Sequence, residues 1–151
     1  MCGIVGLFLK DKSMESQLGA LLTDMLITMT DRGPDSAGIA IYGSEAPDNA
    51  KLTVQSDTPE TDFLDLKSEL AKAIQGSLKI RVQSTHAVLE IQADQLSKAR
   101  TALKSIRPNI RVMSTGESLE IYKEVGLPKD VASRFNLKNM SGSHGIGHTR
   151  M

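Results

Sequence analysis

The residue whose chemistry stands out in this sequence is Cys2, the only cysteine of the chain, placed directly before the apolar run GIVGLFL (residues 3–9). A free cysteine can serve simply as a small buried hydrophobic residue. If Met1 is removed, however, Cys2 becomes N-terminal, and one residue then carries both a thiol nucleophile and an α-amino base. The amine, with a pKa of about 7.7–8.0, can accept the proton of a thiol with a pKa of about 8.5 without help from a histidine. Position alone leaves both alternatives open.

Metal binding is the second chemistry to consider, because His144 and His148 lie four residues apart. On a helix this spacing would place both imidazoles on one face, but Gly145 and Gly147 favour a strand or a loop. No cysteine or carboxylate cluster stands nearby to complete a coordination shell. We therefore predict no metal site and no cofactor, and we expect His86 to be a packed or surface histidine.

Composition limits the class of partner. The 151 residues contain 18 basic and 18 acidic side chains, so the formal net charge is zero, and only 3% of the residues are aromatic. The chain therefore lacks the basic patch and the stacking side chains typical of nucleic-acid binding. It also lacks an apolar run long enough to span a membrane, and its N-terminus does not resemble a secretory signal. A single cysteine excludes an internal disulfide. We expect a cytoplasmic protein with no nucleic-acid or membrane partner.

The elements around Cys2 can be predicted from hydrophobic spacing. Residues 3–9 form a continuous apolar run, which favours a strand buried on both faces. Residues 13–33 have apolar side chains at steps of three and four, as in an amphipathic helix, with Ser13 as its N-cap and Gly33 beyond its end. Residues 37–43 predict a second buried strand. Gly3, next to Cys2, would leave room for a substrate.

A different pattern begins after Gly43. Turn-forming residues predict a loop over residues 43–51. Residues 59–76, 93–108 and 128–135 have helical spacing, and residues 78–84, 85–92, 109–114 and 118–125 have the pattern of strands. This order predicts a compact α+β unit over residues 57–136, of ferredoxin-like type, that interrupts another domain. The interrupted domain would return in the glycine-rich segment that ends at Met151.

Three fragments of the sequence, CGIVGLF (residues 2–8), DRGPDSAGIAIYG (31–43) and GHTR (147–150), together resemble the class II glutamine amidotransferases. These are N-terminal nucleophile hydrolases, so the resemblance implies an α+β fold of the four-layer αββα sandwich type. It assigns residues 1–44 and 137–151 to an amidotransferase domain that is cut short at its C-terminus, with residues 57–136 as the insert. The insert resembles that of glutamate-synthase-like amidotransferase subunits, which include the A subunit of N-methylglutamate synthase.

The resemblance also implies roles for four residues. Cys2, freed of Met1, would attack the side-chain amide of L-glutamine, release ammonia and form a γ-glutamyl thioester that water hydrolyses to glutamate. Arg150 would bind the α-carboxylate of glutamine, because a guanidinium can bond both carboxylate oxygens. Arg32 and Gly33 would lie behind the nucleophile and support the bound substrate. A synthase subunit or domain that accepts the ammonia is the implied partner.

The sequence departs from the family pattern in its oxyanion hole. The Asn-Gly pair that supplies this hole, and a later aspartate that binds the substrate amine, cannot be placed within the 151 residues. One oxyanion donor commonly contributes about 3 kcal/mol, so we expect the chain by itself to be a poor or inactive glutaminase. The alternative function is a non-catalytic regulatory or binding subunit that uses the α+β insert, with Cys2 vestigial. Lipidation or redox chemistry at Cys2 is a weaker third option.

Overall fold

The computed structural model describes residues 2–44 and 47–151, and the chain divides into two compact units. The first consists of Met1–Ser44 and Ile121–Met151, and the second of Glu45–Glu120. The sequence predicts an insert over residues 57–136, but residues 121–136 lie in the first unit, and the second begins earlier. Met1, whose removal the resemblance implies, lies outside the described residues, as do Glu45 and Ala46 of the predicted loop.

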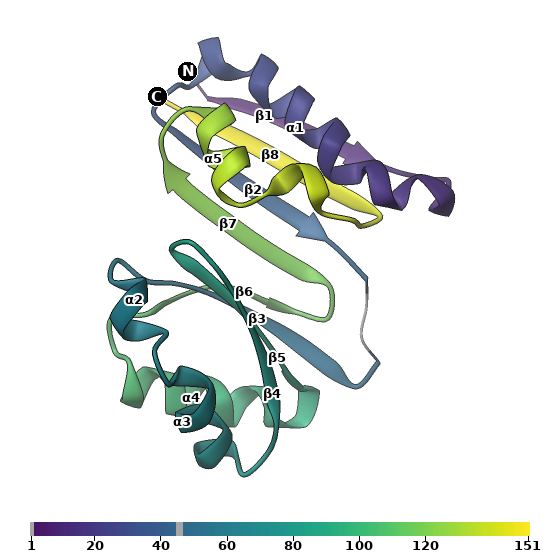
Figure 1. Cartoon of the computed structure of the whole chain (residues 1–151). Coiled ribbons are helices and arrows are strands. Elements are labelled where there is room, and N and C mark those ends of the chain that lie inside the picture. The colour runs from purple at the N-terminus through teal and green to yellow at the C-terminus, as the bar shows by residue number, and fades with distance from the viewer. Residues whose placement is uncertain (1, 45–46) are drawn as a thin grey trace. The chain divides into compact units, whose positions relative to one another are not determined.

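The first unit is one antiparallel sheet with helices on one face (Figure 1). Its strands lie in the order β1-β8-β2-β7. The strand bounds are β1 (Gly3–Phe8), β2 (Ser36–Tyr42), β7 (Leu119–Val125) and β8 (His144–Arg150). The helices are α1 (Leu18–Thr28) and α5 (Pro128–Arg134), with short 3₁₀ helices η1 (Lys12–Gln17), η2 (Thr30–Arg32) and η4 (Leu137–Asn139). The chain thus brings its two ends together, because β1 and β8 are neighbouring strands.

Glycines allow α1 to lie close to β8. A Cβ atom on Gly147 would lie 2.9 Å from both Leu26 Cδ1 and Val5 Cγ2, and one on Gly145 would lie 2.8 Å from Leu22 Cδ2. Both leucines are fully buried. Gly145 and Gly147 therefore let the apolar face of α1 pack directly on the backbone of β8.

Two predictions for this unit are wrong. Residues 3–9 are expected to be buried on both faces, yet β1 alternates, and its Ile4 and Phe8 side chains are 72% and 64% exposed. The reason is that α1 and α5 cover only one face of the sheet. The long helix predicted over residues 13–33 also begins later, at Leu18. It is preceded by η1, whose cap is the Asp11 carboxylate, which accepts hydrogen bonds from the amide and hydroxyl of Ser13 at 2.9 and 2.8 Å. The hydrogen bond from the Ser13 hydroxyl, and to a smaller extent that from the Ser13 amide, lowers the pKa of the Asp11 carboxyl.

The second unit is also an antiparallel sheet with helices on one face (Figure 1). Its elements follow the order β3 (Asn49–Gln55), α2 (Pro59–Asp62), α3 (Leu66–Ile74), β4 (Leu78–Gln83), β5 (His86–Gln92), η3 (Ala93–Gln95), α4 (Leu96–Ile106) and β6 (Arg111–Gly116). In space the strands lie in the order β4-β5-β3-β6. Side chains of the sheet and of α3 and α4 form one hydrophobic core, which includes Leu52, Leu70, Leu89 and Leu103.

One of the two central strands of this sheet, β3, is absent from the sequence prediction, which places a loop over residues 43–51 and a helix after it. In the structure β3 pairs with β5 on one side and β6 on the other. Its side chains alternate between the core face (Leu52 and Val54) and the opposite face (Lys51 and Thr53), and all four are buried. The second unit is therefore built around a strand that directly follows the predicted loop.

A buried ionic network lies on the opposite face of this sheet. The Glu120 carboxylate accepts hydrogen bonds from Lys51 Nζ at 3.0 Å and from Arg81 Nη2 at 2.7 Å. The side chains of Lys51 and Glu120 are only 9% and 8% exposed. Removing one member of such a pair would leave the other charge buried without its partner, which is costly.

Membrane insertion through a helix is not supported by the structure. Within residues 2–44 and 47–151, every helix falls short of the combination of length and apolar character that a bilayer crossing needs.

Candidate functional site

Cys2 and Arg150 lie at the same end of two neighbouring strands. The register of β1 on β8 pairs Gly3 with Thr149, so one further step places Cys2 opposite Arg150. Side chains alternate along a strand, and both residues fall in the set that faces away from α1. Both are exposed. The fold therefore brings together the candidate nucleophile and the candidate carboxylate-binding side chain, which are separated by almost the whole sequence.

Gly3 holds the backbone behind Cys2 against the helix-covered face. A Cβ atom at this position would lie 2.8 Å from Thr149 Oγ1 and 3.2 Å from Met29 Sδ. Thr149 is fully buried, and its hydroxyl donates a hydrogen bond to the Met29 carbonyl at 3.3 Å. The sequence predicts that Gly3 makes room for a substrate, but Thr149 and Met29 fill that room. Gly3 instead anchors the start of β1 by close packing.

Gly33 packs against the backbone of Arg150. A Cβ atom on Gly33 would lie 2.5 Å from the amide nitrogen of Arg150 and 2.7 Å from its carbonyl carbon. The next two residues continue the contact, because Pro34 forms a parallel bridge to Arg150 and the Asp35 amide donates a hydrogen bond to the Arg150 carbonyl at 3.0 Å. We call residues 33–35 the clamp. The clamp contacts the backbone of Arg150 from the side of β2. Any side chain on residue 33 would collide with that backbone.

Arg32 lies one residue before the clamp, at the end of η2, and is exposed. Its amide donates a hydrogen bond to the Met29 carbonyl at 3.0 Å, which closes the turn after α1. Arg32 and Gly33 are thus brought to the same end of the sheet as Cys2 and Arg150.

Two further residues build this end of the sheet. Ser36 is paired with Arg150 across β2 and β8, so its side chain lies on the same face as that of Arg150. The Thr149 hydroxyl links β8 to the end of α1 through its hydrogen bond to the Met29 carbonyl. The position of Ser36 beside Arg150 is visible only in the strand register. Thr149 is part of the GHTR motif, so the motif is a sequence signal for it.

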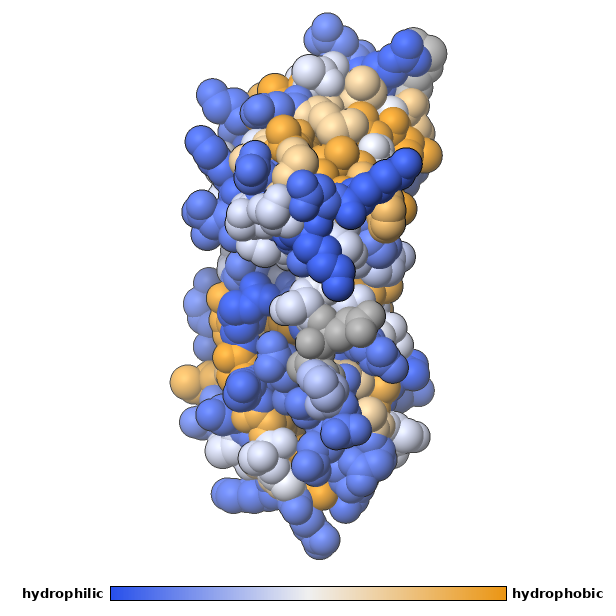
Figure 2. Space-filling model, turned by 90° about the vertical axis from the view of Figure 1, so that its right-hand side faces the viewer, coloured by the Kyte–Doolittle hydropathy of each residue, from blue (hydrophilic) through white to orange (hydrophobic). Residues whose placement is uncertain are grey.

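The sheet face that carries Cys2 and Arg150 has an apolar middle. We call it the open face, because α1 and α5 cover the other side. Ile4, Phe8 and Ile146 lie on it and are 72%, 64% and 44% exposed. Hydrophobic side chains, orange in Figure 2, reach the molecular surface in several places. A row of exposed apolar side chains across adjacent strands is typical of a surface that another element covers.

The two histidines of the glycine-rich segment also lie on the open face, in β8. The ring of His144 stacks on Tyr42 at a centroid distance of 4.0 Å and lies 5.7 Å from the ring of Phe8. His148 is four residues away along an extended strand, so the two imidazoles are separated by about 13 Å. Among the described residues there is no group of three or more histidine, cysteine or acidic side chains that could hold a metal ion. His86, in the second unit, is fully buried and lies 3.0 Å from the Thr85 hydroxyl.

Comparison with known proteins gives two relatives along the whole chain. The chain is 62% identical over 151 residues to "Glutamine amidotransferase-like protein GlxB" of Rhizobium meliloti, a match to all of this chain and 50% of that protein. It is 33% identical over 158 aligned residues to a "Putative glutamine amidotransferase" of Methanothermobacter thermautotrophicus, covering 99% of this chain and 52% of that protein. No protein-family model matches the chain.

The chain spans about half the length of these relatives. Both relatives carry glutamine amidotransferase names.

Proposed function

We propose that this chain is the nucleophile-bearing part of a class II glutamine amidotransferase, which hydrolyses L-glutamine to glutamate and ammonia through Cys2. The observation that carries the proposal is the strand register, which places Cys2 opposite Arg150 on one face of the sheet, with Gly33 against the Arg150 backbone. The names of the relatives support the broader amidotransferase assignment.

In the proposed reaction, Cys2 becomes N-terminal after removal of Met1. Its α-amine takes the thiol proton, and the thiolate attacks the amide carbon of the glutamine side chain. The amine then gives the proton to the leaving nitrogen, so ammonia departs and a γ-glutamyl thioester forms on Sγ. Water hydrolyses the thioester and regenerates the thiol. Anchoring by Gly3 reduces the motion of the terminal residue and keeps the thiol and amine oriented.

Arg150 would bind the α-carboxylate of the same glutamine. Its guanidinium is exposed at the end of β8, and its backbone is held by the clamp, so the side chain extends from a fixed point. A guanidinium can form two parallel hydrogen bonds to a carboxylate, which fixes orientation as well as position. Arg32 and Gly33 are the supporting residues, Gly33 through its contact with the Arg150 backbone.

The fold we propose for the complete protein is the αββα sandwich. In that arrangement a second sheet would pack face to face on the open face of the first unit. The exposure of Ile4, Phe8 and Ile146 supports this proposal, because their burial by a second sheet would be favourable. The 151 residues contain no Asn-Gly dipeptide, so we expect the oxyanion donors to come from outside them.

We propose further that the second unit is a ferredoxin-like insert. Its support is the β-α-β-β-α-β order of β3, α3, β4, β5, α4 and β6, together with the strand order β4-β5-β3-β6. Ammonia is a reactive intermediate, so we also propose a synthase subunit or domain as the partner that accepts it.

Ammonia release from L-glutamine, measured in the complete natural protein that carries this sequence, tests the proposal. Cys2→Ala is expected to abolish release. Arg150→Lys keeps the positive charge but cannot form two parallel hydrogen bonds to the α-carboxylate, so the KM for glutamine is expected to rise about tenfold or more. Arg134→Lys is the matched control, because Arg134 is in the same unit and pairs with Glu124 at 3.8 Å instead. Ammonia release that survives in the Cys2→Ala protein would refute the proposal and favour a binding role.

A further inference from the structure

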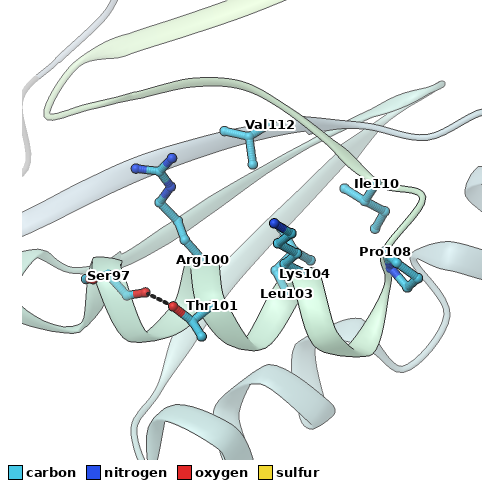
Figure 3. A pocket seen from close by; sticks show the side chains of 8 residues that line it. All are labelled: Ser97, Arg100, Thr101, Leu103, Lys104, Pro108, Ile110 and Val112. Atoms are coloured by element: carbon cyan, nitrogen blue, oxygen red, sulfur yellow. Dashed lines mark hydrogen bonds between the residues drawn. The ribbon is translucent and has the colours of Figure 1, made fainter.

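The second unit contains a cavity of about 400 Å³ between helix α4 and strand β6. Eight residues line it: Ser97, Arg100, Thr101, Leu103, Lys104, Pro108, Ile110 and Val112. Figure 3 shows the Arg100 and Lys104 side chains extending from α4 on the side where Ile110 and Val112 lie. This volume is within the range of small-molecule sites, about 300–1,000 Å³.

The two cations of this cavity have no carboxylate partner within the part of the chain that the structure describes. Arg81, Arg107 and Arg111, the other arginines of the second unit, each lie close to an acidic side chain, at 2.7, 2.9 and 2.6 Å. Arg100, in contrast, is one helical turn from Lys104, and like charges at this spacing repel each other. An anion between them would relieve this repulsion.

The remaining lining supplies both polar and apolar contacts. The Ser97 hydroxyl is available at the first turn of α4, while the Thr101 hydroxyl donates to the Ser97 carbonyl at 3.1 Å and can still accept a bond. Pro108, Ile110 and Val112 form the apolar side, and Val112 is 42% exposed. A ligand that fits this lining would carry one anionic group and one apolar group.

We propose that the cavity between α4 and β6 binds a small organic anion, in which a carboxylate or phosphate group meets Arg100 and Lys104 and an apolar portion covers Ile110 and Val112. This site lies entirely within the second unit, and its proposed ligand is independent of glutamine hydrolysis at Cys2. It would give the second unit a binding function of its own.

Isocaproate, a branched aliphatic carboxylate, is a suitable probe, and its uncharged amide isocaproamide is the matched control ligand. Binding is followed in the full 151-residue chain by amide nitrogen–proton correlation spectra. We expect isocaproate to shift the signals of α4 and β6, and isocaproamide to bind at least about tenfold more weakly, because it lacks the charge-assisted bonds. Equal binding of the two ligands, or no shift in α4 and β6, would overturn the proposal.

Paired variants distinguish a local site from general attraction by positive charge. The Arg100→Gln/Lys104→Gln variant is expected to weaken isocaproate binding about tenfold or more. Lys67→Gln/Lys72→Gln removes the same charge from exposed positions on α3 and is expected to leave binding unchanged. All four positions are exposed on helices, so both variants should retain the spectrum of the folded chain. An equal loss in both variants would contradict the proposed site.

Discussion

Substitution of Gly33 by alanine tests the clamp on Arg150. The new Cβ atom would lie 2.5 Å from the Arg150 nitrogen and 2.7 Å from backbone carbons of Thr149 and Arg150, whereas ordinary contacts begin at 3.4 Å. Because all three atoms are backbone, the loop must move away from β8 by about 1 Å. Overpacking of this kind costs about 1–3 kcal/mol. Weakening of the hydrogen bond between the Asp35 amide and the Arg150 carbonyl adds about 1 kcal/mol, so we expect a total loss of about 2–4 kcal/mol.

The assay is urea unfolding followed by far-ultraviolet circular dichroism, with hydrogen exchange of β8 amides to localise the effect. Gly38→Ala is the matched control, since a Cβ atom there meets nothing closer than 3.8 Å. Gly38 lies in β2 of the same sheet, and its replacement should be neutral or stabilising by up to about 1 kcal/mol. If Gly33→Ala proves as stable as Gly38→Ala, and β8 amides exchange at the wild-type rate, the clamp does not hold Arg150 as described.

Two further predictions concern charge. Glu120→Ala should destabilise the chain by about 3–5 kcal/mol in urea unfolding, because Lys51 would keep a buried charge without its partner. Asp57→Ala is the control, because Asp57 pairs with Arg111 at an exposed position, and it should cost less than about 1 kcal/mol. Similar losses in the two variants would contradict the prediction. The hydrogen bonds from Ser13 lower the pKa of Asp11 from 3.8, so their stabilisation is fully present above that value and is lost as the pH falls through the lowered pKa. The difference in unfolding free energy between wild type and Asp11→Ala should therefore shrink on acidification, and a difference that is constant with pH would count against this linkage.

Local patterns predict much of the first unit. The apolar run before residue 9 and the helical spacing after Met14 correspond to β1 and α1. The same patterns do not show which faces are covered, because burial depends on what lies over the sheet. Ile4 and Phe8 therefore look like core residues in the sequence and are exposed in the structure.

Sequence patterns predict less about contacts between segments that are distant along the chain. β3 has the alternation of a strand, with Ala50, Leu52 and Val54 on one face, but its first residues belong to the run of turn formers that predicts a loop over residues 43–51. The contact of Gly33 with Arg150 depends on a register set over more than 100 residues, which periodicity cannot supply. The family motifs pointed to these residues, whereas the reason that position 33 requires glycine is visible only in the structure.

The candidate site was predicted as a set of residues, and the structure adds how they are held. The four of them (Cys2, Arg32, Gly33 and Arg150) lie at one end of the first sheet. Their roles in catalysis and binding stay a prediction. The contacts of Thr149 and Ser36 depend on the position of β8 next to the end of α1 and next to β2, which sequence patterns do not show.

The most direct test of the central proposal is rapid acid quenching of the complete natural protein during reaction with L-glutamine, followed by mass spectrometry of its N-terminal peptide. The account predicts a peptide that begins at Cys2 and, in a fraction of molecules, carries one added γ-glutamyl group on sulfur. A peptide that retains Met1, or that never carries the glutamyl group while ammonia is being released, would contradict it.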